Sequence, residues 1–205
     1  MPADLTRAAR LVKAAEADFP TEFGHFRISG FEGQGANGSV EEFVALSMGD
    51  LADGRPVLAR IHSQCLTGDV FHSLRCDCRT QLELAIKRVA IEGRGLIIYE
   101  PKEGRGIGLI NKLRAYALQD AGADTVEANE TLGFEADLRD YELAGEIFHQ
   151  FGIKQVRLMS NNPKKIEALE RTGLKVVERV PIVAPQRATT DDYLRTKREK
   201  MGHLI

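Results

Sequence analysis

All three cysteines of this 205-residue chain lie within one short stretch, at Cys65, Cys76 and Cys78. Three thiols cannot all pair with one another, and a reducing compartment would keep them as thiols. Zinc binds thiolate and imidazole ligands in a tetrahedron, with four protein ligands in structural sites and three plus a water in catalytic sites. The Cys-x-Cys pair and the return of the chain to Cys65 therefore predict a zinc site.

Spacing alone leaves the fourth zinc ligand open. A water molecule in that position would make the site catalytic, whereas His62 or His72 would close it as a structural site. The remaining alternative is that the cysteines are small buried hydrophobic side chains, since free cysteine is often interior. Their clustering among polar residues favours a metal.

The balance of charge and hydropathy excludes several classes of protein. The chain has 28 basic and 30 acidic residues, so any phosphate site must be local rather than a property of the whole surface. No apolar run approaches the roughly 18 residues of a membrane span. The first twenty residues lack the apolar segment of a signal peptide. We therefore expect a cytoplasmic protein with neither a membrane nor a nucleic acid as partner.

Hydrophobic periodicity predicts a mixed α/β (α+β) fold, in which helices flank a mixed β-sheet. We expect a single domain over residues 1–205, β-rich in its N-terminal part and alternating between strand and helix in its C-terminal part. The two ends, an N-terminal helix over 1–18 and a tail over 188–205, are expected to be its mobile parts.

The expected elements follow from apolar spacing and from turn residues. Residues 1–20 have the spacing of an amphipathic helix, and Asp53-Gly54 predicts a hairpin turn whose return strand is 57–62. Four helices are expected to end at a glycine, because glycine adopts the left-handed conformation just past a helix end. These glycines are Gly93, Gly122, Gly152 and Gly173, and the other expected strands are 23–31, 42–48, 96–99, 156–159 and 174–183.

Two junctions between a strand and a helix are candidates for phosphate binding. The segment EGRGIG, residues 103–108, is glycine-rich and includes Arg105, and SNNPKK, residues 160–165, combines a hydroxyl, a helix start and two lysines. Backbone N–H groups at such helix starts favour anions. Each segment could equally be a plain turn or a capped helix, but the two together favour a nucleotide.

A third group of candidates surrounds the start of a helix expected over 138–151. Asp137 and Asp140 suit a helix start through the helix dipole, whereas Arg139 is unfavourable there and so is the residue that would face a ligand. Tyr116 falls in the middle of the preceding helix, and its spacing alone favours a half-buried core residue.

Three segments together resemble the GTP cyclohydrolase II family: RIHSQCLTGDVFHSLRCDC, then EGRGIGLINKLRAYALQDAGADTVEANETLGFEADLRDY, then SNNPKK. The resemblance extends from about Phe19 through the YLRTKREKMGH tail. It implies an enzyme that opens the imidazole ring of GTP and releases formate and pyrophosphate, as the first step of riboflavin biosynthesis. It also implies one catalytic zinc ion, magnesium with the triphosphate, and a homodimer.

The resemblance assigns roles to individual residues. Cys65, Cys76 and Cys78 would bind zinc, with water as the fourth ligand. Asp137 matches the family's proton acceptor, Arg139 a proposed nucleophile toward the α-phosphorus, and Tyr116 a tyrosine near the base, which reverses the interpretation of Tyr116 from spacing. The positions that match GTP contacts are Arg60, Ile61, His62, Ser63, Gln64, Gln81, Glu103, Gly104, Arg105, Thr125, Ser160 and Lys165.

The sequence departs from the family pattern at four positions. Gln64 stands where many members have glutamate, Arg79 where glycine is common, Lys102 where glutamine is common, and Ser160 where threonine is common. Gln64 removes a negative charge beside the first cysteine and Arg79 adds a positive charge after the last, so both changes would favour a bound anion near the metal. They also leave open a relative that stops at the formamidopyrimidine nucleotide or acts on another heterocycle.

A non-enzymatic zinc-stabilised module that binds RNA through the basic tail is a third possibility. It has little support, because the basic residues are not concentrated and aromatic residues make up only 6% of the chain.

Overall fold

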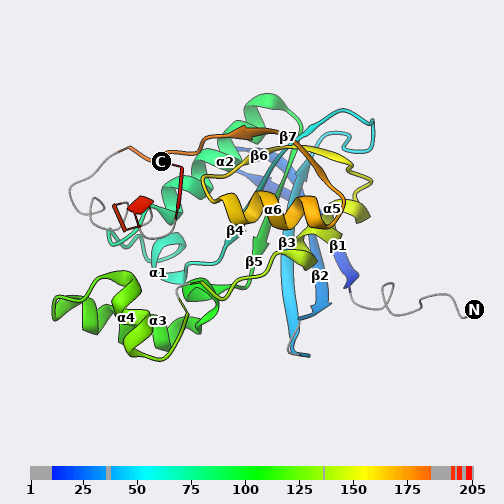
Figure 1. Cartoon of the computed structure of the whole chain (residues 1–205). Helices are drawn as coiled ribbons and strands as arrows, with labels where there is room; N and C mark the ends of the chain where they lie inside the picture. Colours follow the sequence, from blue (N-terminus) through cyan, green and yellow to red (C-terminus); the bar gives the residue numbers. More distant parts are fainter. Residues whose placement is uncertain are drawn as a thin grey trace, which may run out of the picture.

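A computed structural model describes residues 11–35, 38–135, 137–185, 195–196, 198–199 and 202–204. Its described strands form one seven-stranded mixed sheet in the order β1-β2-β3-β5-β4-β6-β7 (Figure 1). The strands are β1 (Leu11–Thr21), β2 (Gly24–Gln34), β3 (Val40–Met48), β4 (Val57–Ser63), β5 (Gly95–Glu100), β6 (Gln155–Met159) and β7 (Lys175–Val180). The mixed α/β fold class expected from the sequence is confirmed.

The sheet has an antiparallel half and a parallel half. β1, β2, β3 and β5 pair antiparallel in turn, whereas β5, β4, β6 and β7 pair parallel. Parallel neighbours need a crossover, which a helix commonly supplies. The helix α2 (Cys78–Glu92) joins β4 to β5, and α6 (Pro163–Arg171) joins β6 to β7.

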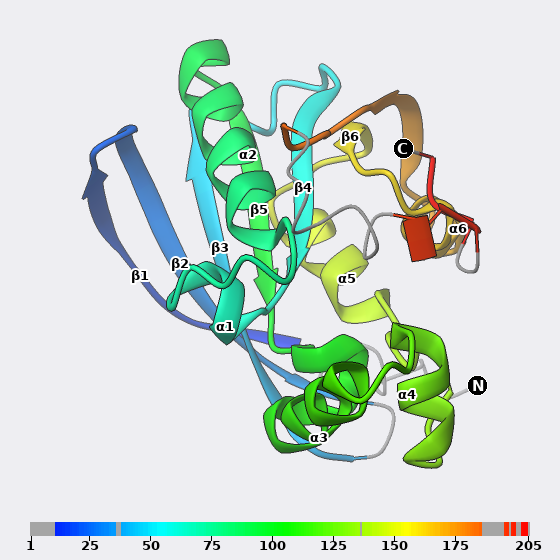
Figure 2. The same ribbon diagram turned by 90° about the vertical axis from the view of Figure 1, so that its left-hand side faces the viewer.

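Helices cover both faces of the sheet, and each face has its own core. α2 packs on one face through Ala85 and Val89 against Phe26 and Ile97. On the other face lie α5 (Glu142–Gln150) and α6, whose apolar side chains include Phe148 and Leu169 (Figure 2). Because both faces of the central strands are covered, β4 and β5 are buried along almost their whole length, and in β4 this includes the polar side chains of Arg60 and His62.

A separate group of helices lies beyond one end of the sheet (Figure 1). It comprises α3 (Gly108–Asp120) and α4 (Thr125–Thr131), reached from β5 through the 3₁₀ turn η1 (Glu103–Gly106). The short helix α1 (Leu66–Asp69) follows β4. Among the described residues, no helix is both long and apolar enough to span a membrane.

The N-terminal helix expected over 1–18 or 1–20 is wrong where the structure describes those residues. Residues 11–21 form β1, an edge strand paired with β2 along its length. The side chain of Glu16 accepts hydrogen bonds across this pair from Arg27 and Ser29. Such a non-local partner can override helical spacing, because strand preference depends on the neighbouring strand. Residues 1–10 lie outside the described part.

Other boundaries also differ from the expectation. β4 does not form a hairpin with β3, because β5 inserts between them. The helix expected over 138–151 begins only at Glu142, so Asp137, Arg139 and Asp140 lie in the preceding loop. The last strand ends at Val180, earlier than expected, and α4 was not expected at all.

The expected helix ends are confirmed. Gly93, Gly122, Gly152 and Gly173 follow α2, α3, α5 and α6, and all four have positive φ, between 69° and 105°. Of the tail from Thr190 onward, most residues lie outside the described part, and residues 195–196 and 198–199 are helical.

Candidate active site

A pocket opens where three parallel strands end at one edge of the sheet. β4 ends at Ser63, β5 at Glu100 and β6 at Met159, and residues that follow each strand line the pocket. In open α/β sheets ligands bind at this edge, where the chain leaves a central strand toward both sides. β4 is that strand here, since β5 lies on one side of it and β6 on the other.

The segment after β4, residues 65–78, is the metal loop, and it brings the three thiols together. Their sulfur atoms all lie within 4.8 Å of one another, and the Sγ atoms of Cys65 and Cys76 are 3.7 Å apart. A tetrahedral zinc ion with Zn–S bonds of about 2.3 Å separates its sulfur ligands by roughly 3.8 Å. The three thiols therefore fit a zinc ion.

Neither histidine completes this cluster. Within the described part of the chain, the three cysteines form the only group of His, Cys, Asp and Glu ligand atoms this close together. His62 instead lies with its Nε2 3.1 Å from Asp69, and His72 is an exposed loop residue with φ of 58°. This arrangement favours three protein ligands over a closed structural site.

The thiols share protons in the absence of a metal. Hydrogen bonds with Cys76 and Cys78 lower the pKa of Cys65, and the nearby Lys112 ammonium lowers it further. The same contacts with Cys65 raise the pKa of Cys76 to about 11 and also raise that of Cys78. A divalent cation between the sulfur atoms would replace the shared protons.

Gly68 provides the space into which the sulfur atoms converge. A Cβ atom at this position would lie 2.9 Å from Cys76 Sγ and 3.0 Å from Cys65 Sγ. The first distance is shorter than real Cβ contacts and the second is unusually tight, so any side chain here would press on two of the three thiols. The glycine is therefore required by space at the cluster.

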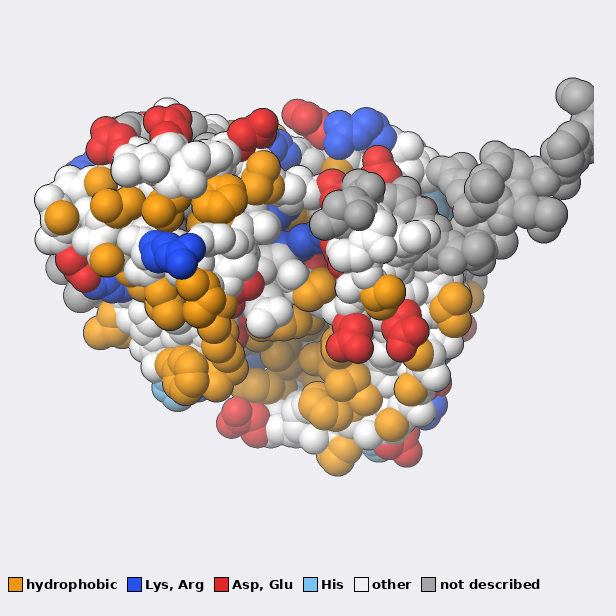
Figure 3. All heavy atoms as spheres, turned by 90° about the horizontal axis from the view of Figure 1, so that it is seen from below, with side chains coloured by type: hydrophobic (Ala, Val, Ile, Leu, Met, Phe, Trp, Pro, Cys, Tyr) orange, Lys and Arg blue, Asp and Glu red, His pale blue; other side chains and the backbone are white. Residues whose placement is uncertain are grey.

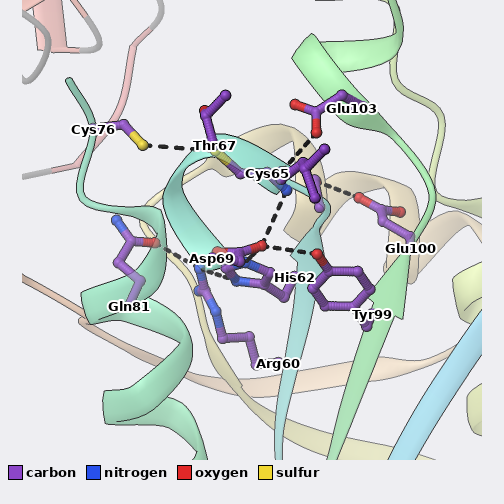
Figure 4. Close-up of polar contacts among 12 residues, drawn as sticks. Arg60, His62, Cys65, Thr67, Asp69, Cys76, Gln81, Tyr99, Glu100 and Glu103 are labelled. Carbon is purple, nitrogen blue, oxygen red and sulfur yellow. Dashed lines mark hydrogen bonds and ion pairs between the residues drawn. The ribbon is translucent and has the colours of Figure 1, made fainter. Parts of the chain in front are cut away.

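Asp69 anchors the metal loop to the sheet (Figure 4). Its carboxylate accepts hydrogen bonds from the Cys65 backbone N–H at 3.0 Å and from the Tyr99 hydroxyl at 2.9 Å. The ring of His62, which contacts the same carboxylate, stacks on Tyr99 with 5.5 Å between ring centroids. Burial lowers the pKa of His62 more than Asp69 raises it, which favours the neutral ring as a hydrogen-bond donor to Asp69.

The glycine loop, residues 103–108, holds an arginine in an unusual conformation. Gly104 and Arg105 have φ of 60° and 62°, in the left-handed region that disfavours side chains other than glycine. Both terminal nitrogens of Arg105, Nη1 and Nη2, are buried without a hydrogen-bond partner among the described residues. Strained residues of this kind are concentrated at ligand sites. Arg105 lines the pocket, so an anionic ligand would supply its missing partner.

Positive charge dominates the pocket wall. Seven basic residues line it against a single carboxylate, Glu103, among the described residues. A cavity with one sign of charge concentrates ligands of the other sign. The seven are Arg60, Arg75, Lys102, Arg105, Lys112, Arg139 and Lys165.

Arg139 is held in place by Asp137 and Ser63. Its Nε donates to Asp137 Oδ1 at 2.8 Å, its Nη2 to Asp137 Oδ2 at 2.6 Å, and its Nη1 to Ser63 Oγ at 3.0 Å. Burial alone would lower the pKa of Arg139, but the hydrogen bonds with Asp137 raise it above its usual value. The guanidinium therefore stays protonated and fixed at the edge of the pocket.

Lys165 lies deeper, beside the buried carboxyl of Glu100. Its Nζ donates to the Ile61 carbonyl at 2.8 Å and to Ser63 Oγ at 3.3 Å, and it lies 4.0 Å from Glu100. Burial lowers the pKa of Lys165 to about 7, although Glu100 opposes this shift. An anionic ligand would favour the protonated form.

The SNNPKK segment, residues 160–165, lies at the start of α6, as the sequence predicted. Asn162 caps the helix by accepting from the Lys164 backbone N–H at 3.0 Å, and Pro163 occupies the first turn. The Nδ2 of Asn162 is buried and has no partner among the described residues. Ser160 and Asn162 both line the pocket.

The structure brings most of the predicted site residues into this one pocket. Three predicted residues are not among its described lining: Ile61 lies in the core and its carbonyl accepts from Lys165, Asp137 accepts hydrogen bonds from Arg139, and the Thr125 side chain lies outside the described part. Those that line the pocket are Arg60, His62, Ser63, Gln64, Cys65, Cys76, Cys78, Gln81, Glu103, Gly104, Arg105, Tyr116, Arg139, Ser160 and Lys165.

The residues that depart from the family pattern differ in placement. Gln64 and Lys102 line the pocket, and the Lys102 ammonium is paired with Glu41 at 2.5 Å. Arg79 instead pairs with Glu83 at 2.6 Å and is not among the described lining residues. Its charge is therefore partly neutralised, unlike the added positive charge that the sequence suggested.

Several lining residues were not predicted. Lys112, Ala115 and Gln119 line the pocket beside the predicted Tyr116, all four from one face of α3. Their spacing of three and four residues places them on one helix face, so Tyr116 could have indicated the others. Arg75, Ile107 and Asn161 lie within the cysteine stretch, the EGRGIG segment and the SNNPKK segment, so the sequence indicated their segments but not the residues themselves. No comparable signal marks Asn129 and His203.

A family model described as GTP cyclohydrolase II matches residues 12–181. The chain belongs to this family. GTP cyclohydrolase-2 of Actinobacillus succinogenes is 55% identical over 197 residues, which cover 96% of this chain and 89% of that protein. GTP cyclohydrolase-2 of Yersinia pestis is 54% identical over 196 residues, which cover 96% and 98%. The resemblance seen in the sequence is confirmed, and as a member of the GTP cyclohydrolase II family the chain is a hydrolase.

Among solved structures, one similar structure is that of a two-domain 3,4-dihydroxy-2-butanone 4-phosphate synthase from A. baumannii. The matched region covers 89% of this chain and 43% of that protein's chain. The TM-score is 0.48 and the sequence identity 15%, which is too distant a likeness to support a functional conclusion.

Proposed function

We propose that this chain opens the guanine imidazole ring of GTP and releases formate and pyrophosphate. The product would be 2,5-diamino-6-hydroxy-4-(5-phosphoribosylamino)pyrimidine, in the first step of riboflavin biosynthesis. One observation carries the proposal: a single pocket joins the three-thiol cluster to a cationic wall in which guanidinium nitrogens have no hydrogen-bond partner among the described residues. A nucleoside triphosphate offers phosphates to that wall and a base to the sulfur end.

Cys65, Cys76 and Cys78 would hold one zinc ion in this proposal, because their sulfur spacing fits it. When bound, zinc supplies Lewis acidity that activates water for attack at C8 of guanine. Magnesium would accompany the triphosphate, since it prefers phosphate oxygens and keeps several of its waters.

Tyr116 would orient the base at the sulfur end of the pocket. Its hydroxyl lies 3.2 Å from Thr67 Oγ1, and Thr67 Oγ1 is itself 3.7 Å from Cys65 Sγ. The guanidinium of Arg75 lies over the Tyr116 ring, 4.8 Å from its centroid. These contacts fix the ring within reach of the metal loop and support a positioning role.

Arg139 would stabilise charge on the phosphoryl group that is lost with pyrophosphate. A preorganised guanidinium is suited to this role because it needs no reorganisation as charge develops. The raised pKa of Arg139 opposes deprotonation, so we favour an electrostatic role over a covalent one. Asp137, whose two carboxylate oxygens both contact Arg139, would orient it and would take up a proton only if Arg139 released one.

We further propose a single-domain homodimer located in the cytoplasm. Three free thiols are typical of a reducing compartment. Seen from below, apolar side chains gather on the part of the surface that α3 and α4 form (Figure 3). Ile110 and Leu113 of α3 are exposed there without burial in the core, as expected of a surface that a second copy covers.

Incubation of the purified chain with GTP, zinc and magnesium tests the proposal. We expect formate and pyrophosphate to appear in equal amounts with the diaminopyrimidine product. A formamidopyrimidine nucleotide without free formate would show that the reaction stops after ring opening. No consumption of GTP by zinc-loaded protein would overturn the proposed function.

A further inference from the structure

We infer that Lys112, held by Glu103, is a positioning residue that fixes the Cys65 sulfur for metal binding. The inference rests on the proposed metal site and deepens it, because neither side chain belongs to the three-thiol cluster. The Lys112 Nζ donates to Cys65 Sγ at 3.1 Å and to Glu103 Oε1 at 2.7 Å. Both side chains are almost fully buried, 11% and 8% exposed.

The Glu103 carboxylate holds Lys112 in this position. Its Oε1 also accepts from the Gly104 backbone N–H at 3.0 Å, and its Oε2 accepts from the Leu66 backbone N–H at 2.7 Å. One carboxylate therefore connects the start of α1, the glycine loop and α3. Because Leu66 directly follows Cys65, Glu103 restrains the metal loop from the backbone while Lys112 restrains it at the sulfur.

The arrangement fits the general behaviour of metal ligands. Groups that donate to a ligating atom orient it and tune its electron density, and their loss typically weakens metal affinity by about 10- to 100-fold. In the described part of the chain, Lys112 donates a hydrogen bond from its ammonium group to a cysteine sulfur. Its place on the same face of α3 as Tyr116 makes the helix part of the metal site.

Two metals give complementary readouts for Lys112→Met. We expect zinc affinity, measured by chelator competition, to fall by about tenfold. A hydrogen bond stabilises the sulfur lone pairs, so its loss should shift the thiolate-to-metal charge-transfer band of the Co²⁺-loaded protein to longer wavelength. Lys112→Arg keeps a charged donor and should restore most of both properties.

Lys175→Met is the matched control, because Lys175 is an exposed lysine of β7 outside the pocket lining. It should leave zinc affinity and the Co²⁺ spectrum unchanged. If Lys112→Met fails to fold by circular dichroism, Lys112→Gln replaces it, since its shorter neutral side chain cannot supply a charged donor at the sulfur.

Unchanged zinc affinity and an unshifted Co²⁺ band in the folded variant would overturn the positioning role. Failure of the unaltered chain to bind zinc would overturn this inference together with the metal site. Because both readouts need no GTP, zinc binding without GTP turnover would instead overturn the proposed reaction alone.

Discussion

The two ends of the pocket are built in opposite ways. At the sulfur end, three thiols converge on one another around Gly68 and share their protons. At the cationic end, the protein supplies partners for two of its buried charges, since Arg139 has Asp137 and Lys165 has a main-chain carbonyl, whereas the terminal nitrogens of Arg105 have no partner among the described residues. In the proposed function, the sulfur end would be completed by an ion, whereas Arg139 and Lys165 at the cationic end are already held in place before a ligand arrives.

This difference predicts that substitutions at the two ends separate in their effects. Changes at the sulfur end should lower metal content, and changes at the cationic end should lower turnover or ligand affinity while metal content stays constant. A variant at the cationic end that lowers metal content as much as it lowers turnover would contradict the comparison.

Cys78→Ser should have the largest effect. A serine hydroxyl is a poor zinc ligand at neutral pH, and loss of metal removes several kcal/mol of charge stabilisation, or about a thousandfold in rate. Metal analysis and GTP turnover measure both consequences. Full activity without zinc would contradict the catalytic site, and loss of the fold together with zinc would show that the metal is also structural.

Arg139→Lys keeps the charge but removes the planar fork that contacts Asp137 and Ser63. Removing one preorganised donor typically costs about a hundredfold in turnover. We expect that loss with zinc content unchanged, measured by steady-state kinetics and metal analysis of the same sample. Turnover equal to that of the unaltered chain would exclude Arg139 from the mechanism.

Gly68→Ala should weaken zinc binding by about tenfold while the fold persists, because its Cβ would press on two sulfur atoms. Gly30→Ala is the matched control, since a Cβ there meets nothing within 4 Å. Chelator competition on both variants tests the difference. Equal zinc affinities of the Gly68→Ala and Gly30→Ala variants would show that the metal loop can shift to accommodate the added Cβ without weakening zinc binding.

The smallest effect concerns pH at the cationic end. Burial lowers the pKa of Lys165 to about 7, so the free protein loses this charge as pH rises through 7. Affinity for GTP should therefore fall several-fold, up to about tenfold, between pH 6 and 8.5, because the phosphates favour the protonated form. Part of any pH dependence comes from titration of the phosphates themselves. Lys165→Met should remove the rest. Isothermal titration calorimetry of GTP binding at several pH values, on both proteins, measures the difference.

The same shift has a definite sign for stability. Between pH 7 and the ordinary lysine value of 10.5, the unfolded chain binds a proton that the folded chain lacks. Stability of the ligand-free protein should therefore receive a favourable contribution that grows as pH rises across this window. Chemical denaturation of the Lys165→Met variant, compared with the unaltered chain, checks the slope.

The candidate site was largely predictable because its chemistry is concentrated in short segments. Cysteine spacing predicted the metal cluster, and the glycine and SNNPKK segments predicted the two junctions that line the pocket. Lys112 was missed because a lysine on a helix usually faces solvent, and its spacing from Tyr116 does not by itself indicate the contact with Cys65. His203 was missed because its place depends on how the far end of the chain returns to Asn161, through the Leu204 N–H.

The fold was less predictable where strand pairing is non-local. Residues 11–21 have helical spacing, but their backbone groups pair with β2. The Asp53-Gly54 turn indicated a local hairpin, yet β5, from residues 95–100, takes the place beside β3. Both errors have one cause: partner choice in a sheet is made by segments that a sequence window does not contain.

Arg105 places thermal stability and ligand binding in opposition. Its left-handed backbone suits glycine better by roughly 1 kcal/mol, and its guanidinium has two buried nitrogens without partners among the described residues. Arg105→Gly would thus be a natural outcome of any screen that selects only for a higher melting temperature. Such a screen would select variants that have a higher melting temperature than the parent but bind the anionic ligand more weakly. Melting temperature alone is therefore a misleading measure of function at this position.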